Sequence, residues 1–244
     1  MGIIDLHIHI LPGLDDGACD MDEALEMAVC AVENGMEAVA ATSHSRMHSQ
    51  KPRLETEKYF SVLSQFRKEL RSRNIPLEVF SGMEVMADHS TIESLWKHSL
   101  LTINETRYVL VETPFDIPGN QISEILGELQ RSGYSPILAH PERYFCVKSN
   151  PMLLEEWKKN RIVLQVNKGS LLGEFGQKTK QTADWMLRRR LAGLVATDAH
   201  DTALRTVELD DLLDWMEFEY GYGSIELLME ENPRRILDGM WIGQ

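Results

Sequence analysis

Short runs of apolar and β-branched residues alternate along the chain with longer amphipathic segments. The short runs predict strands at Ile3–Ile8, Ala38–Thr42, Leu77–Ser81, Tyr108–Val111, Pro136–Ala139, Ile162–Val166 and Gly193–Thr197. The amphipathic segments predict helices near Met21–Glu33, Glu55–Arg73, Gln121–Arg131, Leu153–Lys159, Thr179–Arg190 and Arg205–Phe218. Strands that alternate with helices are parallel strands joined by crossovers, so the pattern predicts an α/β fold.

The clearest helical pattern, Met21–Glu33, also carries a start signal. Asp20 precedes it and Glu23 follows three residues later, which is typical of a capping box. A helix-rich tail, Ile225–Trp241, is expected to pack outside the sheet. No stretch rich in Pro, Gly or Ser divides the chain, so we expect one domain over residues 1–244.

Composition and charge limit the kinds of molecule that the protein is expected to bind. The chain has 25 Lys and Arg against 38 Asp and Glu, a formal net charge of −13. Such a charge repels nucleic acid and anionic membranes, and we expect neither as a partner. No apolar run approaches the length of a membrane span and no signal peptide is recognisable, so a cytoplasmic location without membrane insertion is expected. The oligomeric state is left open.

Metal-binding residue types follow the predicted strands at their carboxyl ends. They are His7, His9, His44, Glu84, Glu112, His140, Asp198 and His200, and Asn167 closes the sixth strand in the same way. In a parallel α/β barrel these ends meet on one face, which brings such residues together from distant parts of the chain. Asp16, in the loop after the first strand, adds a further carboxylate.

The residue types indicate which ions the set would hold. Imidazole and carboxylate without thiolate suit Mn²⁺, Fe²⁺ or Zn²⁺. In His7-x-His9 both imidazoles point to one side of the strand, and Asp198-x-His200 repeats this spacing. The set exceeds the coordination of a single ion, so it suits two or three ions that share bridging carboxylates. The candidate ligands are His7, His9, Asp16, His44, Glu84, Glu112, His140, Asp198 and His200.

The hypothesis depends on the whole set, because a lone histidine is more often a hydrogen-bonded core or surface residue than a ligand. His48, His89 and His98 end no predicted strand, and we assign them to that ordinary class.

Several of these residues lie in motifs that resemble a known class. The motifs are His7-Ile8-His9, Leu11-Pro12-Gly13-Leu14-Asp15-Asp16-Gly17, Thr42-Ser43-His44, Val111-Glu112, His140-Pro141-Glu142-Arg143-Tyr144, Asn167-x-Gly169-Ser170-Leu171 and Thr197-Asp198-Ala199-His200. They resemble the PHP class (polymerase and histidinol phosphatase). Within it, they resemble the bacterial protein-tyrosine phosphatases of capsule and exopolysaccharide synthesis. The resemblance covers nearly the whole chain.

The resemblance implies a single-domain PHP fold, a distorted (β/α)7 TIM-like barrel with three divalent ions. Manganese is the expected metal, with iron, zinc or magnesium as alternatives. The implied first ion is bound by His7, His9, Glu84 and Asp198. The second is bound by Glu84, Glu112 and His140, and the third by Asp16, His44 and His200. The family's phosphate-binding arginines match Arg143 and Arg205.

The implied activity is metal-dependent hydrolysis of phosphotyrosine in proteins, and the implied substrate is the tyrosine-rich tail of a bacterial tyrosine kinase. Phe115, Tyr144 and Phe145 are candidates for an aromatic wall beside the tyrosine ring. Substrate choice is expected to depend on surface loops such as Arg46–Pro52.

Two alternatives remain open from the sequence: a PHP phosphoesterase of small molecules such as histidinol phosphate, and a metal-stabilised binding protein without turnover. One departure concerns Thr42-Ser43-His44-Ser45, where family members often have Thr-Pro-His-His. This chain therefore keeps the proposed ligand His44 and lacks the neighbouring imidazole.

A cysteine-dependent mechanism is excluded by spacing. Cysteine phosphatases need an arginine six residues after the catalytic cysteine. The residues six positions after Cys19, Cys30 and Cys146 are Leu25, Met36 and Met152.

Overall fold

The computed structural model describes residues 2–45 and 52–243, with side chains from residue 55 in the second segment. Its strands are β1 (Ile3–Ile8), β2 (Met36–Ala41), β3 (Glu78–Ser81), β4 (Glu84–Met86), β5 (Tyr108–Glu112), β6 (Ser135–Ala139), β7 (Val163–Asn167) and β8 (Leu194–Ala196). All neighbouring strands pair in parallel. The predicted α/β fold is therefore confirmed, and each predicted strand is present.

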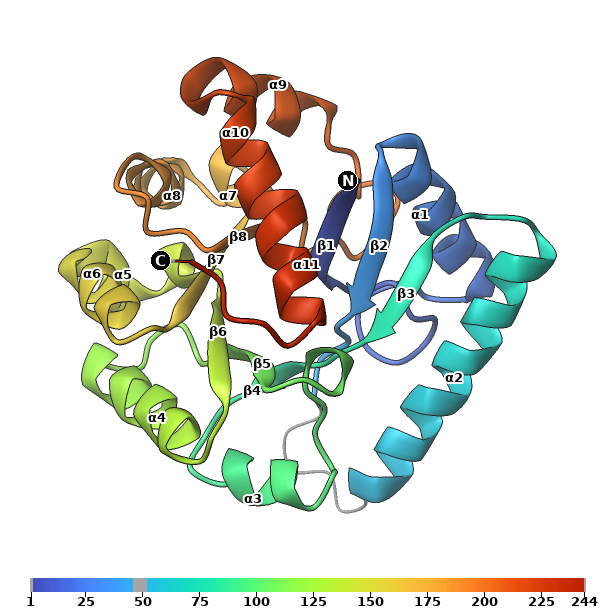
Figure 1. Ribbon diagram of the computed structural model, residues 1–244, viewed down its shortest axis with the longest axis horizontal. Helices are drawn as coiled ribbons and strands as arrows, with labels where there is room; N and C mark the ends of the chain where they lie inside the picture. The colour runs from blue at the N-terminus through green and yellow to red at the C-terminus, as the bar shows by residue number, and fades with distance from the viewer. Residues whose placement is uncertain (1, 46–51, 244) are drawn as a thin grey trace.

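The strands form two parallel sheets with the orders β1-β2-β3 and β4-β5-β6-β7-β8. Isolated bridges connect the sheets, Ile8 with Ala199 on one side and His44 with Glu84 on the other. Among the described residues the hydrogen bonding does not continue as one closed barrel. In Figure 1 the strands lie in the centre and the helices surround them.

The break between the sheets explains why β4 was not predicted. The sequence pattern gave one strand that ended at Ser81, but the chain crosses to the second sheet at Gly82 and pairs again from Glu84. A Cβ on Gly82 would lie 2.9 Å from Thr42 Cγ2 and 3.0 Å from Ile103 Cδ1. Only glycine allows this close approach of the backbone, so the crossing places Glu84 at the start of a strand.

Each predicted amphipathic segment contains a helix, and three further short helices within the described ranges were not predicted. The helices are α1 (Met21–Glu33), α2 (Pro52–Ser72), α3 (Thr91–Trp96), α4 (Gly119–Arg131), α5 (Phe145–Ser149), α6 (Met152–Lys159), α7 (Lys168–Leu172), α8 (Gln177–Arg188) and α9 (Asp210–Tyr220), with short 3₁₀ turns η1 (Ile103–Glu105) and η2 (Pro141–Arg143). The predicted cap of α1 is confirmed, because the Asp20 side chain accepts from the backbone amides of Asp22 and Glu23. No helix in the described part of the chain is long and apolar enough to cross a membrane.

The last predicted amphipathic helix begins later than expected. The sequence predicted a start at Arg205, whereas α9 begins at Asp210. The Asp201 carboxylate accepts from the amides of Ala203 and Leu204 and holds a turn there. The His200 amide also donates to the Arg205 carbonyl at 2.8 Å. Arg205 consequently lies in a loop next to His200.

The C-terminal tail covers one end of the strands instead of packing outside the sheet. It contains α10 (Tyr222–Ile225), the π-helical segment η3 (Glu226–Glu231) and α11 (Asn232–Leu237), and it crosses the centre of Figure 1. Ile236 and Leu237 pack against interior strand residues such as Ile4 and Leu194. Asn232 Nδ2 donates to the Gly193 carbonyl, just before β8 begins. The tail thus buries the amino ends of the strands, and the site lies at their carboxyl ends.

Candidate metal centre

The two histidines of β1 face the same point, and each is oriented by a hydrogen bond. His7 and His9 are fully buried, and their Nε2 atoms lie 3.3 Å apart. His7 Nδ1 donates to Gln165 Oε1 at 2.9 Å, and His9 Nδ1 donates to Asp15 Oδ2 at 2.8 Å. Since a carboxylate and an amide oxygen only accept, the protons lie on Nδ1. Both Nε2 lone pairs are left to face the centre.

His200 shows the same arrangement from the far end of the chain. Its Nδ1 donates to the Asp198 carbonyl at 3.0 Å. Its Nε2 is buried without a hydrogen-bond partner among the described residues and lies 3.6 Å from Asp16 Oδ1. Buried polar atoms rarely stay unpaired in proteins. A nitrogen lone pair beside a carboxylate fits a ligand to a cation.

Glu84 occupies the middle of the cluster and faces several imidazoles. Its Oε2 atom lies 3.0 Å from His44 Nδ1 and 3.3 Å from His7 Nε2, while Oε1 lies 3.0 Å from His140 Nε2. Glu112 Oε1 lies 3.0 Å from the same His44 Nδ1. A carboxylate whose two oxygens face different histidines has the geometry of a bridge between ions.

The structure brings all the predicted ligands together. Their donor atoms form four overlapping groups in which these atoms lie within 4.8 Å of one another. The groups are His9-Asp16-His44-His200, His7-Glu84-His140, His7-His9-Asp198 and His44-Glu84-Glu112. Every candidate residue belongs to at least one group. Because the groups share members, the division of ligands among ions stays a prediction.

Oppositely charged groups in the cluster shift one another's pKa values. Burial alone would lower the pKa of His7, but Glu84 and Asp198 raise it above its ordinary value. Burial opposes the charge of His44 as well, yet Glu112 and Glu84 raise its pKa to about 10. Burial would raise the pKa of Glu84, and His7, His140 and His44 instead bring it well below its ordinary value. The Glu84 carboxylate therefore stays ionised and requires positive charge beside it.

Two residues of the cluster have left-handed backbones. His140 has φ of 36° and Asp198 has φ of 54°. Non-glycine residues in this region carry strain that the surrounding structure must balance, and such residues gather at functional sites. Both lie directly after a strand, where the turn aims the side chain across the carboxyl ends.

Both predicted arginines converge on Asp198. Arg205 Nη2 lies 2.5 Å and Arg143 Nη1 lies 3.5 Å from Asp198 Oδ2, which also accepts from Asn167 Nδ2. The two arginine side chains are half-buried, so they remain accessible at the edge of the cluster. Glu142, the neighbour of Arg143 in the sequence, is fully buried and accepts from the Asn167 amide.

The aromatic residues near the cluster differ in their burial and in their contacts. The Arg143 guanidinium carbon lies 4.7 Å from the Phe115 ring centre and 4.3 Å from that of Phe175, so two rings hold it. Tyr144 is fully buried and its hydroxyl accepts from the Thr113 amide, which removes it from the candidate wall. Phe145 is 58% exposed. Sequence reasoning named Phe115 and missed Phe175.

The family model for capsular polysaccharide synthesis proteins, CpsB/CapC, matches residues 3–238 of this chain. The chain belongs to the CpsB/CapC family. It is 34% identical over 237 residues to the tyrosine-protein phosphatase YwqE of Bacillus subtilis (strain 168), covering 96% of this chain and 91% of that protein. The tyrosine-protein phosphatase CpsB of Streptococcus pneumoniae is 27% identical, with 96% of this chain and 98% of that protein covered.

One solved structure agrees with this membership, and a second shares the fold alone. The first comes from a study of YwqE from Bacillus subtilis and CpsB from Streptococcus pneumoniae, described there as unique metal-dependent tyrosine phosphatases. It matches this CpsB/CapC chain with a TM-score of 0.89 at 34% identity, covering 99% of this chain and 96% of the other. A lactonase from Listeria monocytogenes shares the fold, with a TM-score of 0.62 at 10% identity, 100% of this chain and 95% of the other covered.

Three residues position the CpsB/CapC cluster, of which sequence reasoning missed Asp15 and Gln165 and named Asn167 only as the polar residue that closes its strand. Asp15 accepts from His9 Nδ1 and from the His44 amide at 2.7 Å, although only its neighbour Asp16 was chosen as a ligand. Gln165 orients His7, and Asn167 donates to Asp198. A signal was available for the last two, because polar residues two apart in an apolar strand share one face.

Three histidines were expected to be ordinary core or surface residues and not metal ligands, and two of them lie in the described part of the chain. His89 is exposed and lies 3.3 Å from Glu128, and His98 is exposed at the surface. Neither belongs to a ligand group. His48 and most of the Arg46–Pro52 loop lie outside the described residues.

Proposed function

We propose that this CpsB/CapC chain is a metal-dependent protein-tyrosine phosphatase. The observation that carries the proposal is the orientation of three buried imidazoles, His7, His9 and His200, whose Nε2 atoms face a common cluster of carboxylates. The family membership and the phosphatase relatives support the same reaction. We further propose that residues 1–244 form one PHP-type domain, a distorted (β/α)7 barrel. The bridges between its two sheets support that geometry.

The residues present fit two or three divalent ions, and we propose manganese, with iron, zinc or magnesium as alternatives. Nine nitrogen and oxygen donors without a thiolate match the preferences of these ions. When bound, divalent ions supply an activated water and neutralise the charge of a phosphate ester. The proposed ligands are His7, His9, Asp16, His44, Glu84, Glu112, His140, Asp198 and His200.

The two arginines are proposed to bind the phosphate group of the substrate. Arg143 and Arg205 lie at one edge of the cluster and share Asp198 as their anionic partner. A guanidinium forms paired hydrogen bonds with phosphate oxygens and stabilises the charge that develops during transfer. Phe115 and Phe175 fix the Arg143 guanidinium between them, so that less freedom is lost when phosphate binds.

The proposed physiological substrate is the tyrosine-rich tail of a bacterial tyrosine kinase, which would link the enzyme to capsule or exopolysaccharide synthesis. The family description and the tyrosine-protein phosphatase relatives support this assignment. Phenolate is a better leaving group than an alkoxide, and no acid on the protein is assigned to protonate it.

The test is hydrolysis of a phosphotyrosine peptide by protein reconstituted with Mn²⁺. We expect turnover that is lost in excess chelator and restored by Mn²⁺, and a fall of at least about 100-fold in kcat/KM for Arg205→Ala, since it removes a phosphate contact. His140→Ala should lose bound manganese in elemental analysis, while His89→Ala serves as the histidine control outside the cluster.

Activity that persists in excess chelator, in a protein shown by elemental analysis to hold no metal, would contradict the proposal. A strong preference for histidinol phosphate over the phosphotyrosine peptide would replace the substrate class while leaving the metal centre in place.

A further inference from the structure

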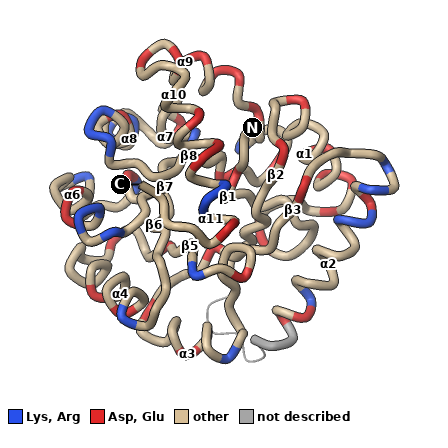
Figure 2. The backbone as a smooth tube through the Cα atoms, in the orientation of Figure 1, with Lys and Arg blue, Asp and Glu red and all other residues tan. Residues whose placement is uncertain are grey.

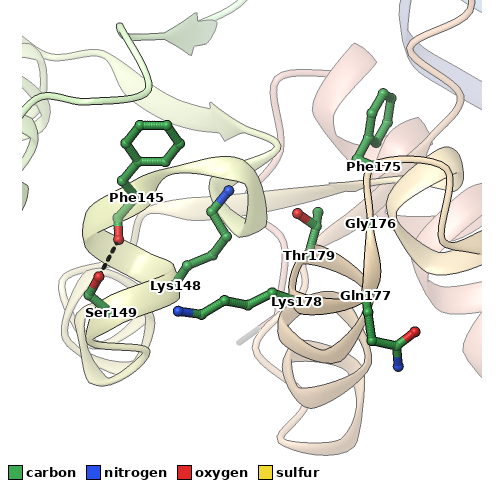
Figure 3. A pocket seen from close by; sticks show the side chains of 8 residues that line it. All are labelled: Phe145, Lys148, Ser149, Phe175, Gly176, Gln177, Lys178 and Thr179. Atoms are coloured by element: carbon green, nitrogen blue, oxygen red, sulfur yellow. Dashed lines mark hydrogen bonds between the residues drawn. The ribbon is translucent and has the colours of Figure 1, made fainter.

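A groove with a cavity volume of about 480 Å³ lies beside the candidate metal centre, between α5 and α8. Figure 3 shows that α5 contributes Phe145 and Lys148, while the other side begins at Phe175 and continues into α8. Phe175 is also the ring that stacks on Arg143 at 4.3 Å. The groove is therefore adjacent to the arginine proposed to bind the phosphate.

The groove is positively charged in an otherwise acidic protein. Lys148 and Lys178 line it from opposite sides, and none of its eight lining residues is acidic. Neither lysine has an ion pair among the described residues. Burial, and after it the charges of Arg143 and Lys178, lower the pKa of Lys148. Figure 2 shows further Lys and Arg residues along α8 and α6. Cations that repel one another in a pocket attract an anion.

The start of α8 adds hydrogen-bond donors to the same groove. Thr179 is 3% exposed and lines the groove from the first turn of α8. Figure 3 shows its hydroxyl on the side that faces α5. The residue before the helix is Gly176, so no side chain caps the first amides of α8. Free amides at the N-terminus of a helix favour an anionic ligand.

The remaining lining combines the aromatic rings of Phe145 and Phe175 with the polar side chains of Ser149 and Gln177. Phe145 is 58% exposed beside the groove, and Lys148 Nζ lies 4.9 Å from its ring centre. A glutamate side chain, with an apolar stem and an anionic end, matches aromatic rings at the edge and ammonium groups inside. The volume accommodates one or two side chains.

We propose that this groove binds an acidic side chain of the protein substrate, within a few residues of the phosphotyrosine. The inference rests on the proposed function, because the phosphotyrosine occupies the neighbouring centre while the flanking residue enters the groove. The groove would then select among phosphotyrosine sites by the charge of their flanks.

The test compares two phosphotyrosine peptides that differ only in having Glu or Gln at the positions flanking the phosphotyrosine. With the manganese-loaded enzyme at low ionic strength, we expect kcat/KM to be about tenfold higher for the Glu peptide, as two partly screened ion pairs allow. The preference should shrink at high salt. In the Lys148→Gln/Lys178→Gln variant the ratio should fall to about 1, through loss of rate on the Glu peptide.

The matched control is Lys68→Gln/Lys159→Gln, which removes the same charge from exposed lysines outside the groove and should keep the tenfold ratio. Equal rates on both peptides with the unaltered enzyme, or an undiminished preference in the groove variant, would overturn the inference and leave the phosphatase proposal intact. If the enzyme prefers a doubly phosphorylated peptide but shows no preference for Glu over Gln, the groove does not bind a carboxylate and the inference is overturned. No hydrolysis of any phosphotyrosine peptide would overturn the proposed function, and the groove inference with it.

Discussion

At the scale of single residues, the cluster depends on side chains that bind no ion themselves. Gln165 is fully buried in β7 and accepts from His7 Nδ1, and its own amide donates to Asn167 Oδ1 at 2.7 Å. A ligand that is held in one tautomer and one orientation needs no rearrangement when a cation binds. Asp15 does the same for His9. These contacts hold the imidazoles in the orientation that binding of a cation requires.

Replacing Gln165 with Leu should weaken metal binding about 10- to 100-fold, since His7 loses the acceptor that fixes its tautomer. The measurement is the Mn²⁺ dissociation constant from isothermal titration calorimetry. Gln165→Glu keeps an oxygen acceptor and should lose less affinity.

The control variant is Gln130→Leu, because Gln130 is partly exposed on α4 and its side-chain amide donates to the Asn160 carbonyl, away from the cluster. An unchanged dissociation constant in Gln165→Leu would show that the orientation of His7 does not depend on this contact.

At the scale of elements, the passage from β3 to β4 positions the central carboxylate. Gly82 lets the backbone pass against Thr42 and Ile103, and two residues later Glu84 begins the second sheet. The bridge between His44 and Glu84 fixes the two proposed ligands across the gap between the sheets. The position of Glu84 in the site therefore depends on a passage between two strands at which a side chain larger than that of glycine does not fit.

Gly82→Ala should lower the free energy of unfolding by about 1–3 kcal/mol, because the new methyl group meets side-chain carbons at 2.9 and 3.0 Å. Urea unfolding followed by circular dichroism measures the change. Gly223→Ala is the matched control: no atom lies within 4 Å of its added Cβ, and it should stay within about 0.5 kcal/mol of the unaltered protein. Equal stability of the two variants would contradict the close approach at Gly82.

At the scale of the whole molecule, the cluster joins distant parts of the chain. His7 and His9 come from the first strand, while Asp198 and His200 follow the last one. The C-terminal tail covers the opposite ends of the strands, where Tyr108 donates to the Met240 carbonyl. The fold is thus held by an apolar cover at one end and a charged cluster at the other.

Metal removal should destabilise the whole domain, because ions that bind only the folded state add to its stability. Free metal at 100 times its dissociation constant contributes about 2.7 kcal/mol, or about 5–10 °C in Tm for a chain of this size. Differential scanning calorimetry with and without chelator measures the shift. His140→Ala should show a smaller shift, and a Tm of the unaltered protein that is independent of chelator would refute the coupling.

The sequence by itself determined most of the strands, the longer helices and the candidate members of the cluster. Apolar periodicity fixes strands and helices locally, and the strand ends of parallel units must share a face, so His7, Glu112 and His140 were predictable without coordinates. Only the tertiary structure decided that Arg143 and Arg205 meet at Asp198, that Gln165 orients His7, and where the tail packs. These contacts join residues far apart in sequence, and local periodicity carries no information about which distant side chains will pack together.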